Sequence, residues 1–213
     1  MACNQQYGDR IMDVIQQTIN SIICSILTAL YQPFWAAFLL TIIAMFVFLY
    51  AKEHHWKINN FLPQMARVWY QEFRSSSTFR RTFLLVFYTT MILFRTVLNR
   101  QIWFDTLGKI MGGWGLYDVD GTLTTESIEN FMLFVPFTVL LFWAFREQIL
   151  GKEIYLKTVI WKSIKVVGIF ALTIEFIQVL FHLGTFQLSD LCYNTIGGVC
   201  GGCIYYGLSK LKK

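Results

Sequence analysis

The chain has 213 residues, of which 55% are hydrophobic and 15% charged, and its formal net charge is +5. This composition excludes an ordinary soluble domain, because too few charged side chains remain to cover a water-facing surface. We expect an all-α integral membrane protein. A β-barrel would instead show short segments of alternating hydrophobicity.

The first 32 residues are predicted to form a separate amphipathic segment. Residues 11–30 place apolar side chains on one helical face and polar side chains on the other. Such a helix lies on a membrane rather than crossing it. Its polar face lacks Lys and Arg, so we expect it on the outer surface, ending at Pro33. A sixth span, which would place the N-terminus inside, is the alternative.

The remaining chain, residues 33–213, is predicted to be one helical bundle of about five transmembrane spans. Each predicted span reaches the roughly 17–25 residues that a membrane-crossing helix requires. The predicted spans are residues 34–51, 82–98, 128–145, 166–183 and 191–208.

The basic residues predict how this bundle is oriented, because Lys and Arg are retained on the cytoplasmic side of short loops. They concentrate between the first two spans, between the third and fourth, and in the tail. Residues 99–130 carry two basic side chains against five acidic ones, and the turn near Gly184 has none that is basic. We expect the N-terminus outside and the C-terminus in the cytoplasm. The net positive charge then reflects topology, and nucleic-acid binding is not expected.

Polar side chains from four spans are predicted to meet in one layer near the outer surface, at a rise of about 1.5 Å per residue. Glu175 stands out, since a carboxylate inside an apolar span costs about 2.5–3.5 kcal/mol and needs partners. Gln178 shares its helical face, as Asn194 shares that of Asp190. The predicted ligand-binding residues are Arg95, Arg100, Asn130, Glu175, Gln178, Asp190 and Asn194.

Within this layer, Arg95 is expected to pair with Glu175 or Asp190. Two interpretations stay open: a hydrogen-bond network that locks the helices, or an outward-facing polar pocket. In the second, Arg95, Arg100 and Lys109 would suit the phosphate of a lipid or lipid-linked sugar. Small residues after Asn194 predict close helix packing; they are Gly197, Gly198 and Gly201.

Two short motifs are interpreted as structural. Residues 118–124, DVDGTLT, are similar to a phosphatase signature, but no soluble α/β domain fits between two spans about 30 residues apart. A tight turn or small hairpin is predicted there. Cys200 and Cys203 form a CxxC pair inside a span, where helix packing explains them better than redox or metal chemistry.

Three blocks of sequence lie at successive predicted spans: ENFMLFVPF (129–137), EFIQ (175–178) and SDLCYNTIGGVCGG (189–202). Together they resemble the pattern of the VanZ family, which is associated with teicoplanin resistance. The resemblance covers the second span to the C-terminus, whereas the first 80 residues match little. Many family members carry an arginine shortly before the last aspartate; this chain reads GTFQLSD there. The positions that the resemblance singles out are Arg95, Asn130, Pro136, Glu175, Gln178, Asp190, Asn194, Thr195 and Gly197.

This resemblance implies a bacterial cell-membrane protein that lowers susceptibility to lipoglycopeptides such as teicoplanin. Candidate partners are membrane lipids, a lipid-linked cell-wall precursor or the lipoglycopeptide itself. The leading prediction is binding of an envelope lipid or lipid-linked precursor at the outer-leaflet site. The alternatives are a small-solute transporter and an enzyme acting on lipid phosphates or headgroups. In such an enzyme, Glu175 or Asp190 would be the general acid or base. No recognised catalytic motif, cofactor or metal site is expected.

Overall fold

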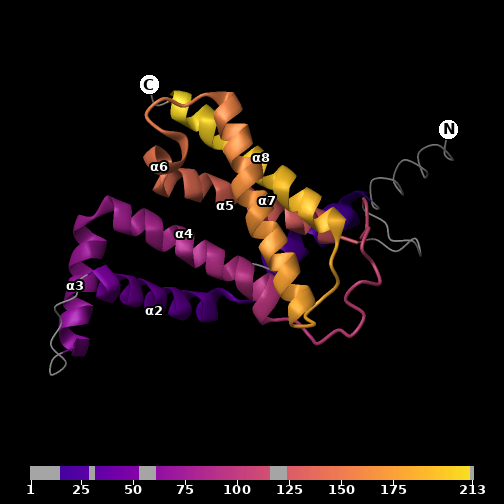
Figure 1. The fold of residues 1–213 in the computed structure, drawn as a ribbon, viewed down its shortest axis with the longest axis horizontal. Helices are drawn as coiled ribbons and strands as arrows, with labels where there is room; N and C mark the ends of the chain where they lie inside the picture. The colour runs from indigo at the N-terminus through magenta and orange to yellow at the C-terminus, as the bar shows by residue number, and fades with distance from the viewer. Residues whose placement is uncertain (1–14, 29–31, 53–60, 116–123, 212–213) are drawn as a thin grey trace, which may run out of the picture.

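The computed structural model describes residues 15–28, 32–52, 61–115 and 124–211, and all regular structure in these ranges is helical. Residues 15–28 form a helix. The later elements are α2 (Phe34–Lys52), α3 (Phe61–Ser75), α4 (Ser77–Leu93), η2 (Phe94–Leu98), α5 (Glu126–Ala144), α6 (Arg146–Leu150), α7 (Leu156–Leu180) and α8 (Leu188–Leu211). Figure 1 shows α2 and α3 at one end of the molecule and the turn between α7 and α8 at the other. The predicted all-helical fold is confirmed.

Three helices in the described ranges are long and apolar enough to cross a membrane: Ser77–Leu98, Glu126–Ala144 and Leu156–Leu180. They correspond to the second, third and fourth predicted spans. The apolar part of α2, Phe34–Leu49, is shorter, and α8 does not reach the same hydropathy although it is 24 residues long. Spans at α2 and α8 therefore stay predictions.

Helix α7 begins earlier than the sequence predicted. It starts at Leu156, ten residues before the expected span, so that Lys157, Lys162 and Lys165 lie on its first turns rather than in a connecting segment. Long basic side chains can extend along a helix toward water while their stems cover apolar surface. Lys165 also places its ammonium 5.5 Å from the centre of the Trp161 ring. The basic residues thus mark a helix end rather than a loop.

A sharp corner joins α3 to α4, and side chains at the corner satisfy the backbone there. The Ser76 hydroxyl accepts a hydrogen bond from the Phe79 N–H at 3.2 Å, which caps the start of α4. The Arg80 guanidinium donates to the Phe73 and Arg74 carbonyls at 3.0 and 2.8 Å, which would otherwise lack partners at the end of α3. Aromatic rings fill the angle between the helices: the Trp69 ring of α3 lies 6.0 Å from that of Phe79 and 5.9 Å from that of Phe83 in α4, between ring centres.

Helix α8 packs tightly against both α5 and α7 through four glycines. A methyl group placed on Gly197 or Gly201 would lie less than 3.0 Å from the backbone of α5, at Phe131 or Val135. Methyl groups on Gly198 and Gly202 would meet side chains of α7 equally closely. The predicted role of Gly197, Gly198 and Gly201 in close packing is confirmed, and Gly202 adds a fourth close contact. The adjoining core consists mainly of Leu85, Ile92, Leu133, Phe134, Phe137, Val167, Ala171 and Ile174.

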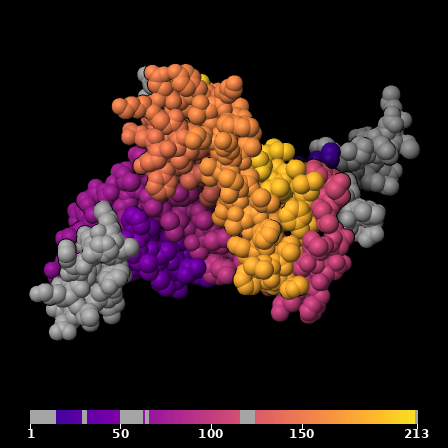
Figure 2. All heavy atoms as spheres, in the orientation of Figure 1, coloured from indigo at the N-terminus to yellow at the C-terminus, as the bar shows by residue number. Residues whose placement is uncertain are grey.

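The segment after η2 is bound to the turn between α7 and α8 by three backbone hydrogen bonds. The Trp103 N–H donates to the His182 carbonyl at 2.6 Å, Phe186 N–H to Thr106 at 2.9 Å, and Leu188 N–H to Ile110 at 2.8 Å. The Tyr193 hydroxyl accepts from the Gly115 N–H at 3.1 Å. Figure 2 shows this segment lying along the end of α7 and the start of α8. The segment after η2 therefore forms one wall of the candidate site.

The N-terminal prediction falls partly outside the described residues, which omit positions 11–14 and 29–31. Residues 15–28 are helical, as predicted. A stripe of Ile15, Ile19, Ile23 and Leu27 is exposed along this helix, at fractions between 47% and 60%. Such a stripe agrees with an interfacial helix, whose membrane placement stays a prediction. The motif at 118–124 also lies almost entirely outside the described residues.

Candidate functional site

A small cavity, here called the polar chamber, lies where η2 and α7 end and α5 and α8 begin. Its volume is about 50 Å³, enough for a small polar group rather than a whole ligand. All of its lining residues carry a polar or charged side chain. They are Arg95, Thr96, Arg100, Glu126, Asn130, Gln178, Thr185, Gln187 and Asp190.

Arg95 pairs with Glu129, and the prediction that it pairs with Glu175 or Asp190 is wrong. Its Nη2 atom donates to Glu129 Oε2, while the other carboxylate oxygen of Glu129 accepts from the Thr125 hydroxyl at 2.6 Å. The Glu129 side chain is 6% exposed and that of Arg95 38%. Glu129 and Arg95 thus hold the first turn of α5 against the end of the second span.

Gln178 crosses from α7 to the second span through a buried hydrogen bond. Its Nε2 donates to the Thr96 carbonyl at 2.7 Å. Thr96 lies in η2, a π-helical turn near the end of the span, where carbonyls lose their regular helical partners. Gln178 supplies the missing donor and fixes the distance between the two helices at the chamber.

Glu175 lies behind the chamber and is 2% exposed. Its Oε2 atom accepts a hydrogen bond from the Gln187 N–H at 2.9 Å, which attaches α7 to the turn that precedes α8. Asp190 and Arg100 are close enough to Glu175 to interact with it electrostatically. Asp190 in turn has the Asn130 side chain within hydrogen-bonding reach, and Arg100 and Glu126 near it. Three carboxylates and one arginine therefore share this corner.

Two larger cavities adjoin the polar chamber and share lining residues with it. The first, which we call the vestibule, has a volume of about 340 Å³ and shares Arg100, Glu126, Thr185 and Gln187. Lys109 adds a second cation to the vestibule. The other cavity, about 630 Å³, runs along residues 107–113. The vestibule is therefore large enough to hold the rest of a ligand whose small polar group occupies the chamber.

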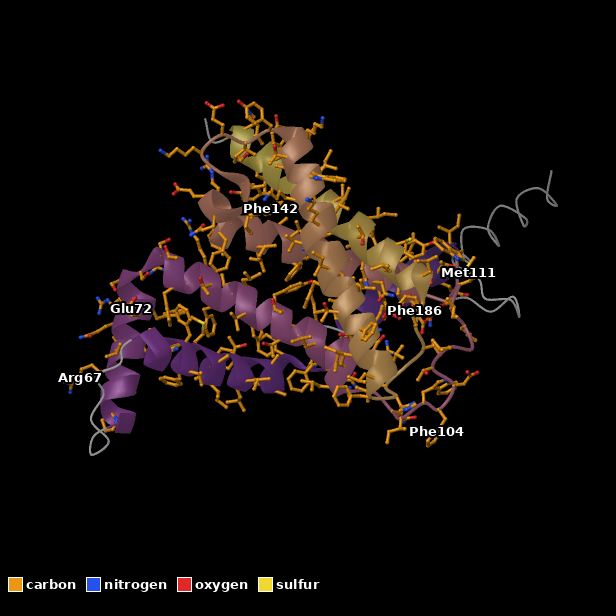
Figure 3. The ribbon with its side chains drawn as sticks, viewed as in Figure 1. Arg67, Glu72, Phe104, Met111, Phe142 and Phe186 are labelled. Carbon is orange, nitrogen blue, oxygen red and sulfur yellow. The ribbon has the colours of Figure 1, made fainter. Side chains whose placement is uncertain are left out.

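Large apolar side chains project from the segment beside the vestibule. Phe104 is 88% exposed and Met111 67%, and Figure 3 shows both on the periphery of this end of the molecule. Others on the same segment are Ile102, Trp103, Leu107, Ile110 and Trp114, each at least 47% exposed. Exposed apolar surface of this extent is typical of a membrane interface. The vestibule thus lies beside a surface suited to lipid.

Five of the seven predicted site residues line the polar chamber: Arg95, Arg100, Asn130, Gln178 and Asp190. Glu175 does not line the chamber, but it accepts a hydrogen bond from Gln187, which does. Asn194 is buried one turn deeper, where its Oδ1 has no hydrogen-bond partner. Ligand binding by these residues stays a prediction. Within the described ranges no cluster of three or more His, Cys, Asp or Glu side chains could hold a metal ion.

The sequence did not predict several residues that contact the predicted site residues or line the chamber beside them. Glu129 precedes Asn130 in the same block and carries a charge at the same depth, which could have marked it as the partner of Arg95. Glu126 lies one turn earlier. Thr185 and Gln187 have no comparable signal, because their positions depend on the turn that binds residues 103–110.

Comparison with known proteins agrees with the three sequence blocks. A family model described as VanZ/LLP1 matches residues 28–210. The chain belongs to the VanZ/LLP1 family. The match begins much earlier than the resemblance indicated, so that the first predicted span also belongs to the family region. No curated protein and no solved structure matches the chain.

In this VanZ/LLP1 chain, the three blocks meet at the polar chamber. The first contributes Asn130, the second Gln178 and the third Asp190. The last block carries no arginine shortly before Asp190. Arg100, from a different segment, instead brings a guanidinium close to Asp190. The blocks are thus distant in sequence but adjacent in space.

Proposed function

We propose that this protein lowers susceptibility to lipoglycopeptide antibiotics such as teicoplanin by binding the phosphate of an envelope lipid or lipid-linked precursor at the polar chamber. Family membership suggests a membrane protein of teicoplanin-resistance type. The ligand is proposed from the charges and cavities of this chain. A bound lipid or precursor would be held where an antibiotic's acyl tail enters the outer leaflet.

The proposal includes a topology of five spans in a bacterial cell membrane, with the N-terminus outside and the C-terminus in the cytoplasm. It adds α2 and α8 to the three helices that are apolar enough to cross. The distribution of Lys and Arg supports this orientation, because the chamber end is poor in basic residues and the opposite end is rich in them. The chamber and vestibule then face the outer leaflet.

Arg100 is the single observation that carries the ligand assignment. It is exposed, lines both the chamber and the vestibule, and has no carboxylate within 4 Å among the described residues. A guanidinium in this position can bind a phosphate through two parallel hydrogen bonds. The chamber is large enough for one small group of the ligand, and the vestibule for a headgroup or sugar beyond it. Nearby Asn130, Gln187 and Glu126 can hydrogen-bond sugar hydroxyls.

A second candidate function is an enzyme that acts on lipid phosphates or headgroups. The observation in its favour is that Glu175 and Asp190, two carboxylates near Arg100, interact electrostatically beside the chamber. Paired carboxylates of this kind can divide the roles of general acid and base. Glu175→Gln would then abolish turnover of a lipid phosphate while its binding persisted. Loss of binding, or little change, would instead agree with a binding protein.

We expect Arg100→Gln to weaken binding of a polyprenyl phosphate about tenfold, the effect of losing roughly one phosphate-facing charge. Binding would be measured by titrating the purified full chain in detergent with the polyprenyl phosphate. The neutral polyprenol of the same length serves as the ligand control and should bind weakly to both proteins. Lys152→Gln, an exposed change at the opposite end, should leave binding unchanged. Equal affinity of wild type and Arg100→Gln for the phosphate would contradict the ligand assignment.

A further inference from the structure

A second charged cavity lies at the opposite end of the molecule, between the start of α4, the end of α5 with α6, and the end of α8. Figure 1 shows these three parts near the C-terminus. The cavity has a volume of about 480 Å³. We call it the arginine cavity, after Arg81 and Arg146; its other walls include Trp143, Tyr205, Leu208 and Ser209. It shares no residue with the polar chamber or the vestibule.

Arg81 is held in the arginine cavity with part of its guanidinium unpaired. Its Cζ atom lies 5.1 Å from the centre of the Trp143 ring, an arrangement that fixes a cation over an aromatic face. Its Nε atom is buried and has no hydrogen-bond partner. A buried donor without an acceptor destabilises the folded protein. Arg81 as a whole is only partly buried and lines the cavity, so the rest of its guanidinium can meet an anionic oxygen there.

Arg146 adds a second unpaired cation to the same space. Among the described residues neither arginine has a carboxylate within 4 Å, even though Glu147 follows Arg146 directly. Both guanidinium groups lie close enough to the Tyr205 hydroxyl to interact with it electrostatically. Two arginines, a phenol and the Ser209 hydroxyl therefore surround one space. The two guanidinium groups and the phenol are donors that suit a phosphate, whereas the Ser209 hydroxyl already donates to the Tyr206 carbonyl at 2.7 Å.

The remaining walls are apolar and point to a lipid as the source of the phosphate. The Leu208 and Trp143 side chains are 51% and 38% exposed at the cavity, and Val139 continues the apolar wall. A free phosphate would fill only a small part of the volume and would leave these side chains in water. Acyl chains would cover them. Under the proposed topology, this position is the level of the inner-leaflet headgroups.

We propose that the arginine cavity binds the headgroup phosphate of an anionic diacyl glycerophospholipid of the inner leaflet. Arg81 and Arg146 bind the phosphate oxygens, and the Tyr205 hydroxyl donates to the headgroup. The Ser209 hydroxyl, which donates to the Tyr206 carbonyl at 2.7 Å, accepts from a headgroup hydroxyl, and the acyl chains lie over Leu208 and Val139. The bound lipid also joins the start of α4 to the ends of α5 and α8. This site does not depend on the ligand proposed for the polar chamber.

The test uses the full chain reconstituted in phosphatidylcholine with a minor fraction of photoactivatable phosphatidylglycerol. We expect cross-links on residues 139–146 and 205–209. Arg81→Gln combined with Arg146→Gln should lower this labelling at least about tenfold, because two phosphate-facing charges are lost. Lys152→Gln combined with Lys157→Gln removes the same charge from exposed positions on the same end and should keep wild-type labelling.

Two further experiments test whether the labelling depends on the cavity and on the lipid headgroup. Ser209→Trp fills the cavity while both arginines remain, and it should lower labelling as strongly as their removal. Photoactivatable phosphatidylcholine should label these residues at least about fivefold less than phosphatidylglycerol. The proposal is overturned if the arginine pair variant or Ser209→Trp labels like wild type, if the two lipids label equally, or if an excess of inorganic phosphate alone abolishes labelling.

Discussion

Gly201→Ala and Gly197→Ala should each destabilise the protein by about 3 kcal/mol, at or beyond the upper end of the usual cost of overpacking. The added methyl group would lie less than 3.0 Å from a backbone carbonyl of α5, that of Val135 or Phe131. A carbonyl cannot rotate away as a side chain can, so α5 and α8 must move apart along their contact. The free energy of unfolding would be measured by titration with sodium dodecyl sulfate in mixed micelles.

The same helices supply two matched controls for this prediction. A methyl group on Gly207 of α8 meets nothing within 4 Å, and one on Gly168 of α7 meets only Thr195, at 3.8 Å. Alanine at such helical positions should be neutral or stabilising by about 0.5–1 kcal/mol. A loss at Gly207 equal to that at Gly201 would show that the close contact of α5 and α8 does not set the stability.

Arg95→Met is expected to cost about 3 kcal/mol, because it leaves the Glu129 carboxylate buried without its charged partner. Glu129→Gln should cost less, about 1–2 kcal/mol, since the half-exposed Arg95 guanidinium can turn toward water while the amide still accepts from Thr125. The asymmetry follows from the difference in burial between the two side chains. Both values would be measured by the same titration.

Removing both charges tests whether the pair itself accounts for these losses. Arg95→Met combined with Glu129→Leu should be more stable than Arg95→Met alone, because no buried charge then lacks a partner. Strict additivity of the losses from Arg95→Met and from Glu129→Leu alone would contradict a direct interaction. So would a greater loss from Glu129→Gln than from Arg95→Met.

The sequence predicted the depth of the polar residues better than their partners. Depth follows from counting residues along each helix, and Arg95, Asn130, Gln178 and Asp190 do line one chamber. The partner of Arg95 depends on how each helix is rotated about its axis, which residue counting does not provide. The small-residue rule was more informative, because the glycines of α8 indicated a close contact whichever helix supplied the neighbour.

The contribution of the segment after η2 could not be predicted from local patterns. Its position depends on backbone hydrogen bonds to the turn between α7 and α8, and the same bonds bring Thr185 and Gln187 to the chamber. Arg100 was predicted as a binding residue from its charge and side of the membrane alone. Its approach to Asp190, where the last block lacks an arginine, required the folded loop. Charge patterns therefore predicted where the site lies, whereas its remaining residues and their neighbours depend on tertiary contacts.

The most direct measurement is the susceptibility of a sensitive Gram-positive host to teicoplanin and vancomycin. The host would express wild type, Glu175→Gln or Asp190→Asn at matched membrane levels. We predict that wild type protects against the lipidated drug and not against vancomycin, and that both variants return teicoplanin susceptibility to that of the empty host. No protection by well-expressed wild type, or full protection by both variants, would contradict an outer-leaflet functional site.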